Sequence, residues 1–170
     1  AFLLHCRDNR ADPLSVRGSY AGAIGIPQFM PSSIRRFAVD FDEDKRIDLR
    51  QSSADAIGSV ARFLADHGWR AGEATHFRVA FDDIQRVQPL IDAGIEPRLT
   101  LDKLGAYGLA SPDAVPPEMP LALIDLPNGD DPTVYLLGGP NFYVITRYNR
   151  SSFYAMAVIE LAQRLKADRP

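Results

Sequence analysis

The sequence of 170 residues lacks three features that would each point to a particular class of protein. Cys6 is its only cysteine, so the chain has no intramolecular disulfide and no metal site built from several cysteines. No apolar run approaches the roughly 18 residues of a membrane-spanning helix, so we expect no membrane insertion by this segment. The net charge of -3 and the pI near 5.6 give no electrostatic basis for binding nucleic acid.

The remaining composition is that of an ordinary globular protein. Hydrophobic residues make up 46% of the chain and aromatic residues 9%, enough for one core or for one core with a small appended module. The stretch 1–6 is apolar from its first residue and has no N-capping side chain, which is typical of the middle of a helix. We therefore expect a helix that starts before Ala1.

The first part of the chain has helical patterns. Apolar residues recur on one helical face between Ser53 and His67, and Gly68 then supplies a C-terminal stop. Pro31 fits the first turn of another short helix. We expect residues 1–73 to form a helical portion.

Beyond Thr75 the patterns of helices and strands are mixed, which predicts an α+β fold. We expect three parts, namely 1–73, a small α/β subdomain at 74–147 with a hairpin, and 148–170, a C-terminal helix that packs back on the helical portion. The predicted elements are a strand at 76–81, a short helix at 100–105, two strands at 121–126 and 133–137 around a loop of about five residues, a third strand at 141–146, and a helix at 153–166 capped by Ser151 or Ser152.

The segment 18–33 places small residues, an amide that looks buried, an aromatic ring and two prolines around a turn. Its glycines indicate positive φ angles or close backbone approach. Gln28 and Phe29 stand between Pro27 and Met30, where a rigid turn would direct an amide and a ring into a cleft. A loop with only a structural role seldom needs this combination.

An acidic run follows this segment and resembles the spacing of an EF-hand calcium loop. Two residues depart from that pattern, because Lys45 replaces the glycine of the sharp turn and Gln51 replaces the bidentate glutamate. Two interpretations stay open, a structural Ca²⁺ site away from the chemistry and a solvated acidic loop. The candidate ligands within this run are Asp40, Asp42, Asp44 and the carbonyl of Arg46.

Several motifs, in the same order, resemble the membrane-bound lytic murein transglycosylase B family; they are 18–33, 38–42, 55–61, 67–69 and 141–149. The resemblance is close at 2–72 and at 137–165. It implies a lysozyme-like helical domain with a small inserted antiparallel sheet. It also implies cleavage of the β-1,4 bond between N-acetylmuramic acid and N-acetylglucosamine with a 1,6-anhydro product. No cofactor would be required. For the possible Ca²⁺ site, the resemblance implies that Asp55 closes it, as an aspartate does in calcium-binding members of the family.

The same resemblance implies where the protein acts and what it binds. The partner would be a peptidoglycan glycan strand. The protein would be located in the bacterial periplasm, with a lipid anchor on a preceding segment. Its oligomeric state would be a monomer. The residues that match the family's substrate-binding positions are Ser19, Tyr20, Gln28, Phe29, Phe63, Tyr148, Asn149 and Tyr154. Phe63 stands where we would expect a tyrosine. For each residue a structural role remains open, such as a turn serine, an amide bonded to local backbone, or a core ring.

The family's general acid and base is a glutamate in a Val-Glu-Thr-like motif before the segment 18–33, which the resemblance places upstream of Ala1. A general acid needs a raised pKa and therefore an apolar, partly closed setting. Glu43 and Glu73 have polar surroundings, Glu96 and Glu118 stand beside prolines, and Glu160 suits an exposed helix position. We therefore expect no catalytic residue in this chain and no turnover by it alone. A non-catalytic peptidoglycan-binding module and a calcium-binding interaction protein are the alternatives.

Overall fold

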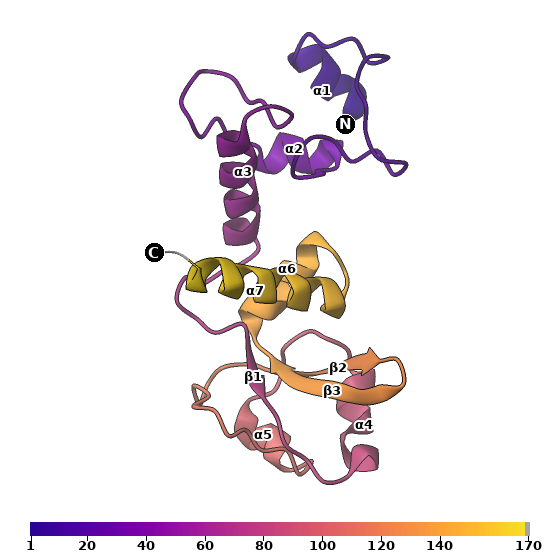
Figure 1. The fold of residues 1–170 in the computed structure, drawn as a ribbon, viewed down its shortest axis with the longest axis vertical. Coiled ribbons are helices and arrows are strands. Elements are labelled where there is room, and N and C mark those ends of the chain that lie inside the picture. The colour runs from indigo at the N-terminus through magenta and orange to yellow at the C-terminus, as the bar shows by residue number, and fades with distance from the viewer. Residues whose placement is uncertain (169–170) are drawn as a thin grey trace. The chain divides into compact units, whose positions relative to one another are not determined.

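The computed structural model describes residues 1–168 and divides the chain into two compact units (Figure 1). The first unit is Ala1–Asp66, and the second begins at His67. No helix within 1–168 is long and apolar enough to cross a lipid bilayer. The expected division into 1–73, 74–147 and 148–170 stays a prediction, and Arg169 and Pro170 of its last part lie outside the described residues.

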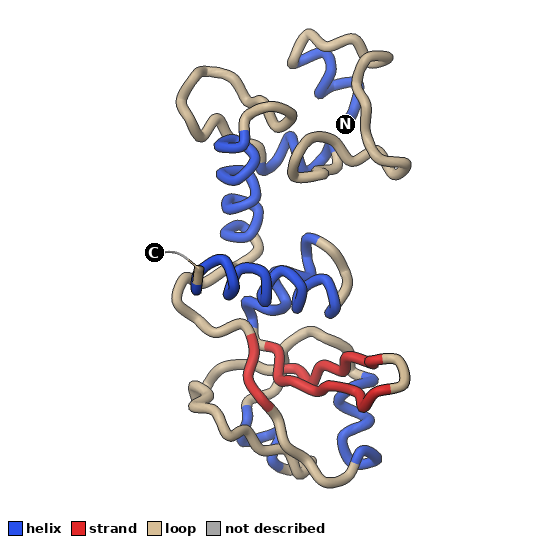
Figure 2. The backbone as a smooth tube through the Cα atoms, viewed as in Figure 1, coloured by secondary structure: helices blue, strands red, loops and turns tan. Residues whose placement is uncertain are grey.

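The first unit contains helices that are joined by long loops (Figure 2). They are α1 (Phe2–Asp8), α2 (Pro31–Phe37) and α3 (Ser53–Asp66). Pro31 occupies the start of α2, where its missing N–H costs no helical hydrogen bond. The helices predicted near the start of the chain, from Pro31 and from Ser53 are thus confirmed.

An aromatic cluster joins the loop before α2 to α2 and α3. The ring centroids of Phe37 and Phe63 lie 4.9 Å apart at an interplanar angle of 69°, and those of Phe29 and Phe63 lie 5.8 Å apart. Edge-to-face contacts of this kind stabilise aromatic pairs beyond the burial of their area. All three rings are buried, so this cluster fixes the position of the turn that contains Phe29.

The second unit is built on a three-stranded antiparallel sheet in the order β1-β3-β2. This arrangement confirms the predicted α+β class with a small antiparallel sheet. Along the chain the elements are β1 (His76–Arg78), α4 (Ile84–Asp92), α5 (Leu101–Gly105), β2 (Ala122–Asn128), β3 (Asp131–Gly138), α6 (Pro140–Tyr148) and α7 (Ser152–Ala167).

Hydrophobic residues cover both faces of this sheet, because neighbouring residues of a strand point to opposite sides. Leu121 and Leu123 join a core with residues of α4 and α5, whereas Ile124 and Leu126 join a core with residues of α6 and α7. Figure 1 accordingly shows α4 and α5 on one side of the sheet and α6 and α7 on the other. The second unit therefore has three layers.

Two expectations for the second unit are wrong. Residues 141–146 form part of α6 and no strand, because Pro140 begins a helix after Gly139 and the buried residues do not alternate along it. The hairpin turn is shorter than predicted, since Asn128 pairs with Asp131 and Gly129 lies between them with a φ of 63°. The ladder is irregular between Leu126 and Asn128, where the intervening Pro127 has no N–H to donate.

The other predicted elements are present. β1 and α5 lie within the segments expected to form a strand and a short helix, and α7 begins where the sequence predicts. The Ser151 side chain accepts a hydrogen bond from the backbone N–H of Tyr154, which makes it the N-cap of α7. α4 was not predicted, because Pro89 lies inside it and interrupts an otherwise helical pattern.

Candidate functional site

The glycine-rich segment of the first unit forms a tight turn around Ser19. The backbone N–H of Ser19 donates to the carbonyl oxygen of Ala23 over 2.9 Å, and the N–H of Gly22 donates to the carbonyl oxygen of Ser19 over 2.8 Å. The Ser19 hydroxyl oxygen accepts a hydrogen bond of 3.0 Å from the N–H of Ala23. The hydroxyl is thus fixed as an acceptor within the turn, while its own hydrogen can be donated to a ligand.

Gly25 allows the next turn to approach the backbone of another segment. Its φ is +77°, and a Cβ atom there would lie 2.5 Å from the carbonyl oxygen of Leu49. The N–H of Ile26 donates to that same carbonyl over 2.7 Å. Only glycine fits this combination of positive φ and close approach without strain.

Gln28 and Phe29 lie next to each other in this turn but differ in burial. Gln28 is exposed and has a φ of 50°, and its side-chain amide donates to the carbonyl oxygen of Gly25 over 2.8 Å. Phe29 is only 3% exposed and lies in the aromatic cluster. The expectation of a buried amide is therefore wrong.

Ser19 lines a small cavity of about 370 Å³ in the first unit. Gly18, Gly22 and Met30 contribute to the same lining, so the cavity lies against the glycine-rich turn. Tyr20 is fully exposed, and Phe63 is buried beside Phe29. The structure thus brings Ser19 to a cavity and brings Phe29 and Phe63 together in the core.

The remaining predicted substrate residues belong to the second unit. Tyr148 ends α6, Asn149 follows it and is exposed, and Tyr154 lies in the first turn of α7. The rings of Tyr148 and Tyr154 are stacked, with centroids 6.4 Å apart and planes at 7°. Burial, and secondly the charge interaction with Tyr154, raises the pKa of Tyr148 to about 12. Tyr148 therefore keeps its phenolic hydrogen at neutral pH and can donate a hydrogen bond.

Three of the predicted metal ligands converge in the first unit. Carboxylate oxygens of Asp40, Asp42 and Asp55 all lie within 4.8 Å of one another. Asp55 is 1% exposed, and its two oxygens accept hydrogen bonds from the N–H groups of Phe41 at 2.8 Å and Asp48 at 2.7 Å. The hydrogen bonds from Asp48 and then Phe41 hold the pKa of Asp55 below its usual value, so this buried carboxyl is ionised at neutral pH.

Asp44 is not among the carboxylates of this group, and the carbonyl of Arg46 stays a predicted ligand. Asp44 is exposed and accepts a hydrogen bond from the N–H of Arg46 over 2.8 Å. Asp40, by contrast, accepts from the N–H of Lys45 at 2.8 Å and still has free lone pairs for a cation. Three carboxylates suit a hard cation such as Ca²⁺, so the residues present fit the predicted ion.

Sequence reasoning missed Ser52, whose hydroxyl donates to a carboxylate oxygen of Asp42 over 2.8 Å. Its hydroxyl oxygen also accepts from the N–H of Asp55 at 3.1 Å, so Ser52 connects two members of the acidic group. A serine directly after Gln51, where the calcium-loop pattern already fails, is a weak signal. Its role follows from the turn that brings the start of α3 beside the loop.

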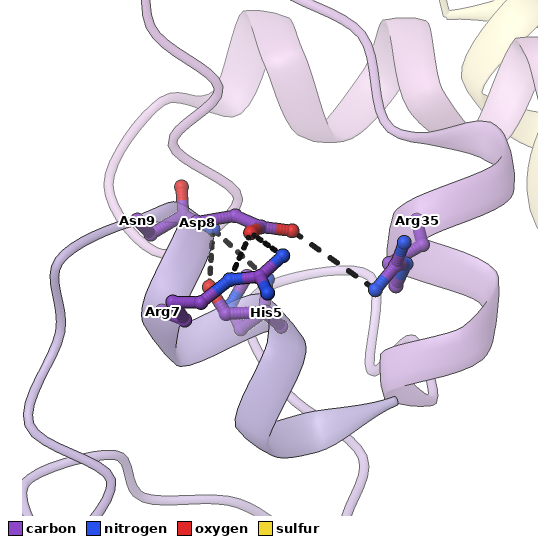
Figure 3. A network of polar contacts seen from close by, with 5 residues as sticks. All are labelled: His5, Arg7, Asp8, Asn9 and Arg35. Atoms are coloured by element: carbon purple, nitrogen blue, oxygen red, sulfur yellow. Dashed lines mark hydrogen bonds and ion pairs between the residues drawn. The ribbon is translucent and has the colours of Figure 1, made fainter.

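Two networks of polar contacts were also not predicted. Arg7 donates to Asp8 at the end of α1 over 2.8 Å, and Arg35 of α2 lies 4.0 Å from the same carboxylate (Figure 3). In the second unit, the fully buried Asn141 bonds to backbone groups of Arg70 and Glu73. These networks connect segments that are distant in sequence, which no local pattern indicates.

The glutamates of residues 1–168 differ in their exposure and in their partners. Glu43, Glu118 and Glu160 are exposed. Glu96 accepts a hydrogen bond of 2.6 Å from Arg98. One oxygen of Glu73 accepts from Arg70 over 3.3 Å, and its other oxygen is buried without a hydrogen-bond partner. Each of these glutamates is therefore exposed or paired with an arginine.

Comparison with known proteins shows similarity over nearly the whole chain. The family model described as the transglycosylase SLT domain matches residues 1–163. Membrane-bound lytic murein transglycosylase B from Escherichia coli (strain K12) is 40% identical over 168 residues, which is 99% of this chain and 45% of that protein. The chain therefore spans about half the length of this curated relative.

Solved structures of bacterial lytic transglycosylases share the fold. The catenated lytic transglycosylase SltB1 from Pseudomonas aeruginosa superposes with a TM-score of 0.86 at 43% identity, covering 99% of this chain and 55% of that chain. Escherichia coli lytic transglycosylase Slt35, solved in complex with calcium, gives a TM-score of 0.85 at 40% identity, covering 99% of this chain and 52% of that chain. These similarities confirm the predicted lysozyme-like fold.

Proposed function

Because this chain belongs to the transglycosylase SLT domain family, we propose that the protein carrying it cleaves the β-1,4 bond between N-acetylmuramic acid and N-acetylglucosamine in peptidoglycan. The product would be a 1,6-anhydro sugar, since the muramyl 6-hydroxyl captures the reacting carbon. The observation that carries this proposal is the family match along almost the whole chain. Murein lies in the bacterial periplasm, so we assign the protein to that compartment, as a monomer.

The chain would contribute contacts to the glycan. The Ser19 hydroxyl is held by the backbone of its own turn and can donate to a sugar oxygen or amide at the adjoining cavity. The exposed side-chain oxygen of Gln28 can accept from a sugar hydroxyl while its amide nitrogen stays bonded to Gly25. The paired rings of Tyr148 and Tyr154 offer an aromatic face, which suits sugars.

The general acid is the part that this chain does not supply. Protonating the leaving oxygen requires a carboxyl that stays neutral until it reacts, and the same group then removes the proton of the 6-hydroxyl. Within residues 1–168, every glutamate is exposed or lies beside an arginine. The chain alone would therefore bind glycan without turning it over.

This absence favours a second candidate function, that of a peptidoglycan-binding module without catalysis. Purified murein incubated with the chain, followed by mass spectrometry of the soluble products, distinguishes the two functions. Release of 1,6-anhydro muropeptides would show that the chain is active alone and would refute our assignment of the missing acid. Retention of the chain on insoluble murein without release supports the binding role.

Variants can test whether the predicted residues cause that retention. Gln28→Ala is expected to reduce the fraction bound to murein while leaving the melting temperature within a few degrees, because its amide is exposed. Gln51→Ala is a matched control, since Gln51 is an exposed amide of the same unit and lies outside the segment 18–33. An equal loss of retention in both variants would contradict the role of Gln28.

A structural calcium ion is a separate part of the proposal. Asp40, Asp42 and Asp55 would hold it, and the ion would connect the loop after α2 to the start of α3. Phe41 stands between the loop ligands Asp40 and Asp42 in the sequence, and its ring packs against Gly58 of α3. Gly58 permits this arrangement, because a Cβ atom there would lie 2.5 Å from the ring. The ion would stabilise the first unit and take no part in bond cleavage.

A further inference from the structure

Gln28 has an unusual backbone conformation that its surroundings must maintain. Its φ of 50° lies in the left-handed region, which is unfavourable for a residue with a Cβ atom. Both its backbone N–H and its side-chain amide donate to the carbonyl oxygen of Gly25, over 3.1 and 2.8 Å. The position of the Gln28 side chain therefore depends on the orientation of a single carbonyl group.

That carbonyl belongs to a peptide unit that is bonded on its other side as well. The carbonyl of Gly25 and the N–H of Ile26 share one planar peptide unit, so they turn together. The Ile26 N–H donates to the carbonyl oxygen of Leu49 over 2.7 Å. Leu49 is buried, and Gly25 has no Cβ atom to separate the two segments. The Leu49 carbonyl therefore sets the orientation of the peptide unit that binds Gln28.

Asp48 holds the peptide unit to which the Leu49 carbonyl belongs. The N–H of this unit is that of Arg50, and it donates to Oδ1 of Asp48 over 2.9 Å. The backbone N–H of Asp48 donates in turn to a carboxylate oxygen of Asp55 over 2.7 Å. A continuous series of hydrogen bonds thus runs from Asp55 through Asp48 to the turn at 24–29.

The series begins at the acidic group of Asp40, Asp42 and Asp55. Carboxylate oxygens of these residues lie within 4.8 Å of one another, and like charges at this distance repel. A bound Ca²⁺ ion would neutralise this repulsion and hold Asp55 in one arrangement with the loop. Because hydrogen bonds in series polarise one another, a firmer hold on Asp55 would strengthen the bonds that follow it.

We propose that Asp48 is a positioning residue for Gln28, and that the hydrogen-bond series through Asp48 couples Ca²⁺ binding to glycan binding. The glycan as ligand rests on the proposed function. Since the turn at 24–29 would already be ordered, less conformational entropy would be lost when Gln28 binds a sugar. The coupling is reciprocal, so glycan would strengthen Ca²⁺ binding by the same factor.

The test measures binding by calorimetry on the whole 170-residue chain. The ligands are Ca²⁺ and a GlcNAc-MurNAc tetrasaccharide without peptides. We expect saturating Ca²⁺ to tighten tetrasaccharide binding about fivefold relative to binding in a chelator, and saturating tetrasaccharide to tighten Ca²⁺ binding by the same factor.

Hydrogen exchange tests the ordering of the turn without any sugar. Ca²⁺ should slow the exchange of the backbone amides of 24–29 more than that of the amides of α1, which lies outside the series. This comparison separates ordering of the turn from a general stabilisation of the first unit.

Three variants test the role of Asp48. Asp48→Ala removes the acceptor of the Arg50 N–H and none of the carboxylates of the acidic group, so we expect Ca²⁺ binding with a coupling below about twofold. Asp48→Asn has the same charge as Asp48→Ala but keeps an oxygen acceptor, and it should retain the coupling. Asp12→Ala is the matched control and should also retain it, because Asp12 is an exposed aspartate of the same unit whose Oδ1 accepts the N–H of Leu14.

The outcomes separate this inference from the proposed function. Equal tetrasaccharide affinity with and without Ca²⁺, or no Ca²⁺ binding, overturns the inference and leaves the glycan contacts unaffected. A lower melting temperature of Asp48→Ala with unchanged coupling would show a merely structural role and would also overturn it. If Asp48→Ala does not fold, the two reciprocal titrations on the unaltered chain decide.

Absence of tetrasaccharide binding in both conditions would argue against the proposed glycan contacts. The hydrogen exchange of 24–29 then decides the inference on its own. Slower exchange of these amides with Ca²⁺ supports the positioning of Gln28, and an unchanged rate overturns it.

Discussion

Replacement of Asn141 by leucine should strongly destabilise the second unit. Asn141 is completely buried, and its side chain makes three hydrogen bonds to backbone groups about seventy residues earlier in the chain. Its Oδ1 accepts from the N–H of Arg70 at 2.9 Å, and its Nδ2 donates to the carbonyl oxygens of Arg70 at 2.8 Å and Glu73 at 3.0 Å. Asn141 thus fixes the segment that leads into β1 against α6.

The size of the stability loss follows from the buried backbone groups that would lose their hydrogen-bond partner. Leucine has a similar shape but no polar atom, so Asn141→Leu leaves up to three backbone groups without partners. Each buried unsatisfied group costs about 1–3 kcal/mol. Gly72 and the side chain of Arg70 are exposed, so water can reach part of the segment and lower the cost. We expect a loss of about 3 kcal/mol, or roughly 10–20 °C in melting temperature for a unit of this size.

The assay uses the only tryptophan of the chain. Trp69 lies in the second unit and packs against the core formed with α6 and α7, so its fluorescence reports on this unit during urea unfolding. Asn149→Leu is the matched control, because Asn149 is exposed just after α6, and it should change stability by less than about 0.5 kcal/mol. Asn141→Asp should destabilise nearly as much as Asn141→Leu, since a carboxylate has no N–H to donate to the two carbonyls. A loss below about 1 kcal/mol for Asn141→Leu would refute the reasoning.

Three further predictions concern the first unit. Gly25→Ala should cost about 2–3 kcal/mol in urea unfolding followed by circular dichroism, because of its positive φ and the nearby Leu49 carbonyl; an unchanged midpoint would contradict this. Millimolar Ca²⁺ should raise the melting temperature of the unaltered chain and not of Asp55→Asn, and equal shifts in a calorimeter would exclude Asp55 as a ligand. Folding lowers the pKa of Asp55 from 3.8, so its stabilising effect is present above that value and is lost as the pH falls through the folded pKa. Acidification from about pH 6 to about pH 2.5 should therefore destabilise the unaltered chain more than Asp55→Asn, as measured by thermal unfolding in the two buffers.

Elements with local start and stop signals could be predicted from the sequence. α3 and α7 have amphipathic patterns and serines at their starts, and Pro31 marks the first position of α2. α6 could not be predicted in this way, since its aromatic and β-branched residues favour a strand locally. Burial of Phe142 and Ile145 beneath α7, together with the hydrogen bonds of Asn141, favours the helix instead.

The candidate site, too, could be predicted from the sequence only in part. Spacing alone indicated Asp40 and Asp42, because ligands of a calcium loop alternate along the chain. The contribution of Ser52 could not be predicted, since it depends on a turn that returns the chain to the loop. The absence of ion pairs at Lys45, Arg46 and Arg50 within residues 1–168 is likewise a property of the folded unit.

The turn at 24–29 has a structural role that supports the binding role proposed for Gln28. Ile24 and Phe29 pair through two backbone hydrogen bonds of 2.9 and 3.1 Å, and both side chains are buried. Gln28, one residue away, is held at positive φ by its own bond to Gly25 and remains exposed. Because the buried pair fixes the backbone, the amide of Gln28 would lose little conformational freedom in the sugar contact that we propose. The rigidity of this turn would therefore contribute to the proposed recognition even though Phe29 itself lies in the core.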